Sequence, residues 1–353
     1  MKRLTTRSIM SQFIQLHTLT SYAPSNLNRD DLGRPKTAKM GGCERLRVSS
    51  QSQKRHWRTS ALFEQAMNGK LGTRTKRFGH TVYDALIEQN VKEKMALEWA
   101  GAIAGQFGKL KKGTLEIEQL AHISPTEQDL ALSLIAIIAK ENRAPTVDEL
   151  KAIKSKQTAV DIALFGRMLA SSPEFNVEAA CQVAHAISVH QVTVEEDYFT
   201  AVDDLNDGKT ESGSAHIGEA GFAAALFYHY ICINKTQLIE NLGGDEELAN
   251  AAIAALTEAA VKVSPTGKQN SFASRAYASY VMAEKGDQQP RSLSVAFLKP
   301  ISEQDMGSAA IDALSKQAIN FDQVYGVCAD SRYEVNAMTG EGSFAKLCQF
   351  VTE

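Results

Sequence analysis

The chain has 353 residues, of which 44% are hydrophobic and 22% charged, and its formal net charge is -3. This composition excludes a largely disordered chain and can form one large elaborated domain or two smaller ones. The longest apolar runs, at residues 130–139 and 223–233, are shorter than the roughly 20 residues that a membrane-spanning helix needs. The five cysteines form no CxxC pair, which favours reduced thiols and predicts a cytoplasmic protein without membrane contact.

The N-terminal part of the chain predicts a strand followed by a helix. Residues 9–20 alternate apolar and polar side chains, which is typical of a half-buried strand. The run Ser50-Gln51-Ser52-Gln53 fits a capping box with Ser50 as the N-cap. We therefore expect a helix from Ser50 to about Met67.

The rest of the chain alternates between helical and strand-like patterns. Residues 81–156 are helical in character and predict a helical insertion. We expect strands at residues 160–167, 181–192, 222–234, 271–283 and 292–298. We expect helices at residues 246–263 and 308–318. A mixed α+β core follows from this order.

Residues 28–58 carry nine Lys or Arg and three acids, a net charge of +6, so the rest of the chain carries -9. These cations lie beside a predicted helix start, where unpaired backbone N–H groups and the helix dipole attract anions. Gln51, Lys54 and Arg58 would follow on one helix face. A solvated charged loop is the alternative, but the pattern favours binding of a nucleic-acid phosphate backbone.

Residues 192–222 carry eight acids and one Lys, with four glycines and the apolar Tyr198, Phe199 and Val202 between them. The pattern predicts an extended hairpin. Its apolar side chains could wedge between bases, which needs a flat ring or apolar bulk rather than charge. The hairpin could also dock on the basic patch of a neighbouring copy, or its aromatic residues could anchor a surface loop.

Four sequence blocks have an order and spacing more specific than any single short motif. They are Pro24 and Ser25 with residues 27–31, residues 47–52 with Lys54 and Arg55, residues 160–164 with 166–168, and residues 199–205 with 213–218. Through these blocks the chain resembles the RNA-binding backbone subunit of type I-E CRISPR Cascade complexes, the CasC-type member of the Cas-seven family.

The resemblance implies an RRM-like (ferredoxin-like) palm, a helical fingers insertion and an extended thumb hairpin. The implied order is residues 1–71 for the first part of the palm, 72–159 for the fingers, 160–190 for palm strands, 191–222 for the thumb and 223–353 for the C-terminal part of the palm.

The resemblance also implies a function in antiviral defence. Copies of the chain would line up head-to-tail along the spacer of a guide RNA (crRNA), a contact that does not close and so builds a helical filament. Each thumb would flip out a nucleotide periodically, and the guide would pair with target DNA. The implied partners are other Cascade subunits and, indirectly, a target-degrading nuclease. No cofactor and no enzymatic activity of the chain itself are implied.

The family's functional positions map onto three groups of residues. Those expected to bind the RNA backbone are Asn28, Arg29, Lys36, Ser49, Ser50, Gln51, Lys54, Arg55 and Arg58. Those expected at the thumb and base wedge are Arg167, Met168, Phe199, Thr200 and Val202. Lys109, Lys111, Lys112, Lys151 and Lys154 are candidates for steering duplex DNA, although a solvated helix face explains each of them as well.

Two other functions stay open from the residues. Asp30 and Asp31 could cleave RNA, as an aspartate in this loop does in the backbone subunits of type III complexes. The chain could also be a stand-alone single-stranded RNA-binding protein, although that function leaves the acidic hairpin unexplained. The eight histidines have no zinc-ligand spacing, and no GxSxG, Walker or GxGxxG motif is present.

Overall fold

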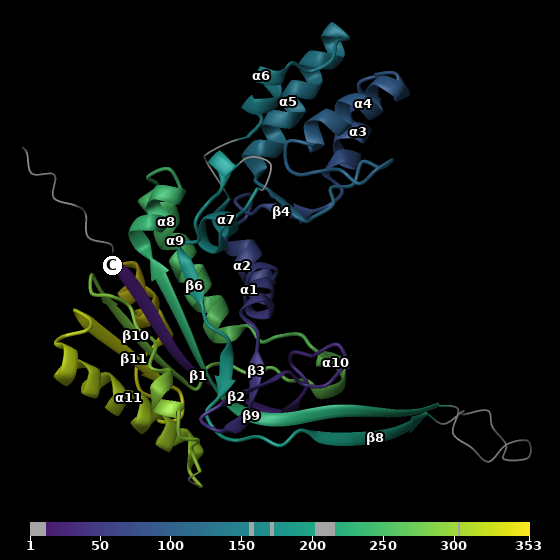
Figure 1. Cartoon of the computed structure of the whole chain (residues 1–353). Coiled ribbons are helices and arrows are strands. Elements are labelled where there is room, and N and C mark those ends of the chain that lie inside the picture. The colour runs from purple at the N-terminus through teal and green to yellow at the C-terminus, as the bar shows by residue number, and fades with distance from the viewer. Residues whose placement is uncertain (1–11, 155–158, 170–172, 202–215, 303) are drawn as a thin grey trace, which may run out of the picture. The chain divides into compact units, whose positions relative to one another are not determined.

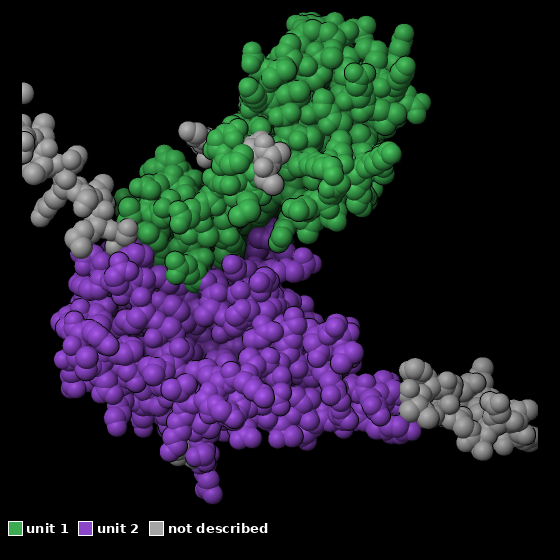
Figure 2. All heavy atoms as spheres, in the orientation of Figure 1, with its two compact units in different colours: residues 1–11, 61–182, 233–255 green, residues 12–60, 183–232, 256–353 purple. Residues whose placement is uncertain are grey.

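The computed structural model describes residues 12–154, 159–169, 173–201, 216–302 and 304–353. Val202, predicted for the base wedge, lies outside these residues. The chain forms two compact units, coloured separately in Figure 2. Apart from the first eleven residues, unit 1 comprises Ala61–Gln182 and Ile233–Ala255, and unit 2 comprises Gln12–Ser60, Val183–Cys232 and Leu256–Glu353.

Unit 2 is built on an antiparallel sheet (Figure 1). Within the described residues the strand order is β11-β10-β1-β9-β7-β3-β2, and β6 and β8 also pair with β9. The strands are β1 (Phe13–Ser25), β2 (Thr37–Met40), β3 (Cys43–Val48), β6 (Cys181–Val183), β7 (Ala186–Ser188), β8 (Glu195–Ala201), β9 (His216–Asn234), β10 (Tyr280–Gly286) and β11 (Ser331–Asn336). The predicted α+β class is confirmed.

Strand β1 is central in this sheet, and its residues 14–19 are buried on both faces, so the expectation of a half-buried strand was wrong for this part. Ile14 and Leu16 are buried as predicted, but Gln15 and His17 are equally buried. Their polar side chains find partners on the second face: Gln15 Oε1 accepts a hydrogen bond from Tyr230 Oη at 2.7 Å. A buried polar group is tolerated when it is paired in this way.

Glu284 is the centre of a buried ionic cluster beside β1. Its carboxylate binds the guanidinium groups of Arg291 and Arg332 and lies 3.2 Å from His17 Nε2. Burial alone would raise the pKa of Glu284, but hydrogen bonds from His17 and Arg291 outweigh it and hold the pKa below its usual value. Burial lowers the pKa of His17, against the effect of Glu284. The two arginines therefore carry the charge that balances Glu284, beside a neutral His17.

Helix α11 (Met306–Tyr325) and the 3-10 turn η2 (Ser294–Phe297) pack on the sheet of unit 2. Leu19, Tyr280, Phe297 and Leu314 belong to the resulting core. The remaining helices of unit 2 are α1 (Ser50–Arg58), α10 (Gln269–Phe272) and α12 (Phe344–Thr352), and α9 (Glu246–Lys262) begins in unit 1 and ends in unit 2.

Unit 1 is mainly helical and has its own apolar core, which includes Trp99, Ile103, Ile135 and Ile138. Its helices within the described residues are α2 (Ala61–Ala66), α3 (Phe78–Glu88), α4 (Glu93–Ala104), α5 (Pro125–Glu141), α6 (Val147–Ala152), α7 (Val160–Phe165) and α8 (Lys235–Asn241). The short strands β4 (Thr73–Thr75) and β5 (Ala121–Ile123) pair with each other, and η1 is a 3-10 turn (Pro173–Phe175).

Several predicted elements need correction. Residues 160–165 form helix α7 rather than the expected strand. The segment is buried on all sides, so its apolar residues show no helical period from which the sequence could have identified a helix. The expected strand at 292–298 contains the 3-10 turn η2. The strand at 181–192 is divided into β6 and β7, and the helix from Ser50 stops at Arg58.

Candidate nucleic-acid interface

The turn that follows β1 is organised by the side chain of Asp30. Its Oδ1 accepts hydrogen bonds from the backbone N–H groups of Leu32 (3.0 Å) and Arg34 (2.9 Å). Gly33 has a φ of +83°, a conformation that favours glycine. The Lys36 N–H then donates to Asn28 O at 2.8 Å. The turn presents Arg29 on the surface, and Asp30 serves as its internal cap.

The N-cap of α1 is Ser49 and not Ser50. The Ser49 hydroxyl accepts from Ser52 N, and the Ser49 N–H donates to Asn28 Oδ1 at 2.9 Å. The capping pattern in the sequence was therefore shifted by one residue. Asn28 and Ser49 connect the turn after β1 to the helix, so they hold the binding residues in place from within.

The first turn of α1 receives a further contact that the sequence did not predict. His185 Nδ1 accepts the Ser50 N–H at 3.2 Å and lies 3.3 Å from Arg47 Nη1. Burial, followed by the charges of Arg47 and Lys36, lowers the pKa of His185. A neutral imidazole at this position leaves the positive charge to the arginine and the lysine. No local pattern marked His185, which is 135 residues distant from Ser50.

The predicted backbone-binding residues of α1 lie on its outer sides. Gln53 and Trp57 form its buried face, whereas Gln51 and Arg55 are exposed. Lys54 and Arg58 are half-buried. The last turn contains Arg55, His56 and Arg58, and the helix has no acid in its first turn. The helix therefore presents cations and amide groups without nearby acids of its own.

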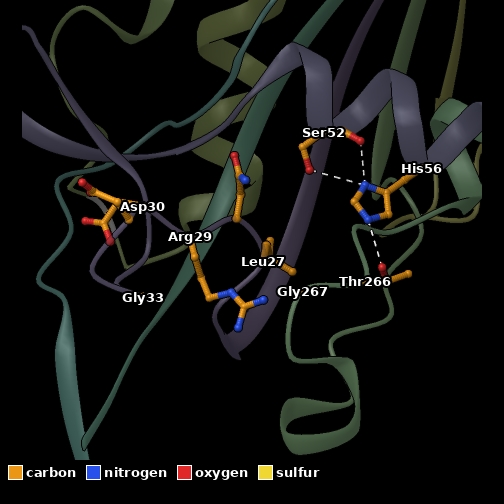
Figure 3. A pocket seen from close by; sticks show the side chains of 10 residues that line it. Leu27, Arg29, Asp30, Gly33, Ser52, His56, Thr266 and Gly267 are labelled. Atoms are coloured by element: carbon orange, nitrogen blue, oxygen red, sulfur yellow. Dashed lines mark hydrogen bonds between the residues drawn. The ribbon is translucent and has the colours of Figure 1, made fainter. Parts of the chain in front are cut away.

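A hollow of about 550 Å³ lies between this turn and α1 (Figure 3). Asn28, Arg29 and Asp30 of the turn and Ser52 and His56 of α1 are among its lining residues. Its other lining residues are Leu27, Asp31, Gly33, Thr266 and Gly267. Polar groups dominate this lining, which suits a sugar-phosphate chain better than an apolar ligand.

The predicted thumb is a β-hairpin at its base. Strands β8 and β9 pair antiparallel, with Phe199 opposite Gly218. Arg34 forms an ion pair with Glu196 on this hairpin. Phe199 is 44% exposed, and Thr200 is exposed as well. The hairpin thus carries an accessible aromatic ring on an acidic strand.

Arg167 and Met168 have opposite environments in unit 1. The Arg167 side chain is only 2% exposed and binds the buried Glu127 through two hydrogen bonds of 2.6 and 3.0 Å. Met168 is 84% exposed. Because it is buried, the Arg167 side chain cannot contact a base in this structure. Its ion pair with Glu127 instead fixes the backbone next to the exposed Met168.

The five candidate lysines for DNA differ in their surroundings. Lys109 and Lys111 form ion pairs with Glu118 and Glu116 at 3.0 and 2.7 Å. Lys154 is 8% exposed, with its ammonium 5.0 Å from the centre of the Phe175 ring, and burial lowers its pKa. Lys154 therefore does not suit direct DNA contact. The remaining two, Lys112 and Lys151, are exposed.

Other kinds of site find no support in the described part of the chain. No group of three or more His, Cys, Asp or Glu is arranged there to hold a metal ion. None of the helices in the described residues is long and apolar enough to cross a membrane. All five cysteines are free thiols.

Comparison with known proteins relates the whole chain to CRISPR complexes. No curated protein matches it significantly. One solved structure, "CRISPR RNA-guided surveillance complex, pre-nicking", contains a chain with a TM-score of 0.83 and 29% sequence identity, covering 96% of this chain and 99% of that one. A chain of another "CRISPR RNA-guided surveillance complex" gives a TM-score of 0.73 and 25% identity over 96% of this chain and 99% of that one. A family model described as CT1975-like protein matches residues 14–348, and the chain therefore belongs to the CT1975-like family.

Proposed function

We propose that this chain binds the guide RNA (crRNA) of a CRISPR RNA-guided surveillance complex and forms part of the backbone of that complex. The observation that carries the proposal is the near full-length similarity to chains of such complexes. Four cations supply the chemistry: Arg29 and Lys36 lie between β1 and β2, and Lys54 and Arg58 lie on α1, all in unit 2.

The proposed contacts are with sugar and phosphate. Asn28 and Ser49 fix the loop and the helix start, and the cations neutralise phosphates. Such contacts position a strand without reading its bases. The guide sequence would then be read by pairing with target DNA alone, so that one protein surface serves any guide.

The finer assignment follows from the resemblance in the four sequence blocks. We propose a type I-E Cascade subunit of the CasC type, which acts in the cytoplasm with other Cascade subunits and, indirectly, a nuclease. Copies would stack head-to-tail along the crRNA. Phe199 and Thr200 on the thumb, and Met168, would displace a nucleotide at regular intervals. Exposure of Phe199 and Met168 supports these assignments.

We further propose that the chain is not itself a nuclease. Asp30 Oδ1 is occupied by two backbone N–H groups of its own turn, which supports a structural role for this acid. Incubation of the assembled complex with complementary RNA and Mg²⁺ tests the alternative. Regularly spaced cuts that disappear in Asp30→Asn or Asp31→Asn would establish a type III-like endoribonuclease instead.

The first test of RNA binding is the salt dependence of affinity. Lys54→Ala with Arg58→Ala should weaken binding of a labelled oligouridine and reduce the slope of log K against log salt by about 1.4, or about 0.7 for each lost single-strand phosphate contact. Lys316→Ala with Lys346→Ala removes the same charge from exposed sites on α11 and α12 and should leave the slope unchanged. Equal slopes in both variants would refute the placement of the phosphate site.

Co-expression with a CRISPR array and the neighbouring genes tests the backbone role. Several copies on one intact spacer-containing RNA, measured by native mass spectrometry and RNA sequencing, would support it. A stand-alone single-stranded RNA-binding protein would instead purify as one copy with RNA of random sequence.

A further inference from the structure

The hollow beside α1 has a second wall, from a segment far along the chain. Thr266 and Gly267 line it together with Asn28 and Arg29, and Figure 3 shows Thr266 directed toward His56. We call residues 264–279 the α10 loop, because they include helix α10. None of the four sequence blocks and none of the predicted site residues lies in this loop.

The α10 loop is attached to the RNA-binding elements by specific contacts. His56 Nδ1 lies 2.6 Å from Ser52 O, a carbonyl that can only accept, so Nδ1 carries the proton in the neutral ring. Nε2 can then accept from the Thr266 hydroxyl at 2.9 Å. A Cβ on Gly267 would lie 2.3 Å from Leu27 O, so only glycine allows this close approach.

The two ends of the loop are joined to each other, and its middle contacts β9. The Ser264 hydroxyl accepts from Ala276 N at 2.8 Å and donates to Ala276 O at 3.0 Å. Phe272 packs against Phe222 of β9, with ring centroids 6.1 Å apart. The loop therefore extends from the hollow to β9, and Thr266, Gly267 and Phe272 make its contacts with other elements of unit 2.

The loop has the composition of a nucleic-acid contact. No Asp or Glu occurs from residue 259 to residue 283, while Lys268 and Arg275 supply two cations. Arg275 is exposed, and Tyr277 is 68% exposed. Tyr277 follows Arg275 by two residues, and an exposed aromatic ring next to a cation is a platform on which a base can stack. These groups contrast with the acidic surface of the thumb.

The backbone on either side of α10 is strained. Lys268 and Ala273, which flank α10, have φ values of +45° and +48°, a region that residues with a side chain rarely adopt. Strained backbone of this kind gathers at ligand-binding positions.

We propose that the α10 loop is a second RNA-binding wall, in which Lys268 and Arg275 bind phosphates of the guide and Tyr277 stacks on one of its bases. The proposal rests on the proposed function, because the RNA is the one held by Arg29 and α1. It adds the statement that the guide lies between α1 and the α10 loop and continues along it toward the thumb.

The test uses the full chain and labelled oligouridine. Lys268→Ala with Arg275→Ala should reduce the salt slope by about 1.4, as for two lost phosphate contacts. Tyr277→Ala should weaken binding at least about fivefold with little change in slope, whereas Tyr277→Phe should retain affinity because the ring remains. The matched control is again Lys316→Ala with Lys346→Ala, and circular dichroism checks the folding of each variant.

The outcomes separate this proposal from the one on which it rests. A wild-type protein that does not bind RNA would overturn both. The salt slope of RNA binding could fall in Lys54→Ala with Arg58→Ala but not in Lys268→Ala with Arg275→Ala. That result would overturn only the proposal that the α10 loop binds RNA. Normal RNA binding by the loop variants, with loss of copies from the purified complex, would show that the loop contacts a protein instead, and would also refute the proposal.

Discussion

Replacing Arg167 by methionine would test whether this residue is structural or contacts RNA. The structure buries its guanidinium on Glu127, which is itself fully buried. The same carboxylate completes the capping box of α5: Glu127 Oε2 accepts from the Ser124 N–H at 2.9 Å, and Ser124 Oγ accepts from the Glu127 N–H at 3.2 Å. Arg167→Met would thus leave a buried, uncompensated charge at the start of α5.

The magnitude follows from that uncompensated charge. Removal of one partner of a buried ion pair costs about 3–5 kcal/mol. Arg167 also donates to His122 O at 3.0 Å, and this hydrogen bond, worth about 1 kcal/mol, is lost as well. We expect the free energy of unfolding of unit 1 to fall by about 4–6 kcal/mol. Adding Glu127→Gln should recover about 1–3 kcal/mol, because glutamine removes the buried charge and still suits a capping box.

The two tryptophans of the chain make the assay specific. Trp99 is in the core of unit 1 and Trp57 is buried in unit 2. In a Trp57→Phe background, fluorescence during urea unfolding reports on unit 1 alone. Far-UV circular dichroism gives a second probe, because transitions that coincide by both probes indicate that the chain unfolds in one step.

Two results would contradict this reasoning. A loss of less than about 1 kcal/mol in Arg167→Met would mean that the ion pair contributes as little as a surface pair does. A reduced salt slope of RNA binding in the folded variant would return Arg167 to the group of RNA contacts, where its resemblance to the family placed it. We expect RNA affinity to be unchanged once the fraction of folded protein is taken into account.

Two further predictions concern unit 2. Burial, opposed by the hydrogen bond to Ala184 O, lowers the pKa of His229 to about 4. The stabilisation that follows is complete above the unfolded pKa of about 6.5 and is lost as pH falls toward 4. Its total is about 3 kcal/mol. His229→Gln should remove that component from urea unfolding followed by Trp57, and an identical pH profile in both proteins would contradict the assignment. Gly41→Ala would place a Cβ 1.7 Å from Leu298 O and should lower the free energy of unfolding by well over 2 kcal/mol. Gly42 has open space around it, so Gly42→Ala should lower it only by the ~1–2 kcal/mol that a positive φ costs. Equal losses of stability in the two variants, measured in the same assay, would contradict this difference and show that the turn between β2 and β3 relaxes to remove the clash.

The limits of local pattern are clearest in β1 and α7. Alternation in β1 identified a strand, but it could not show that a polar network covers the second face, because Glu284 and Tyr228 are more than 200 residues away. In α7, the buried Asp161 is paired with His122 and with the Gly72 N–H. Without those distant partners, a short apolar run is equally compatible with a strand.

The sequence by itself determined the features that depend on neighbours in the chain: the charge excess of residues 28–58, a helix start within one residue of its position, and the acidic hairpin that carries Phe199. It also carried the blocks that resemble a known family. Only the tertiary structure decided which cations are exposed, because burial of Arg167 and Lys154 depends on the packing around them. Only the tertiary structure could also show the contact of Thr266 with His56, which are 210 residues apart. The hollow beside α1 is formed by elements that the fold brings together and not by one continuous segment of the chain.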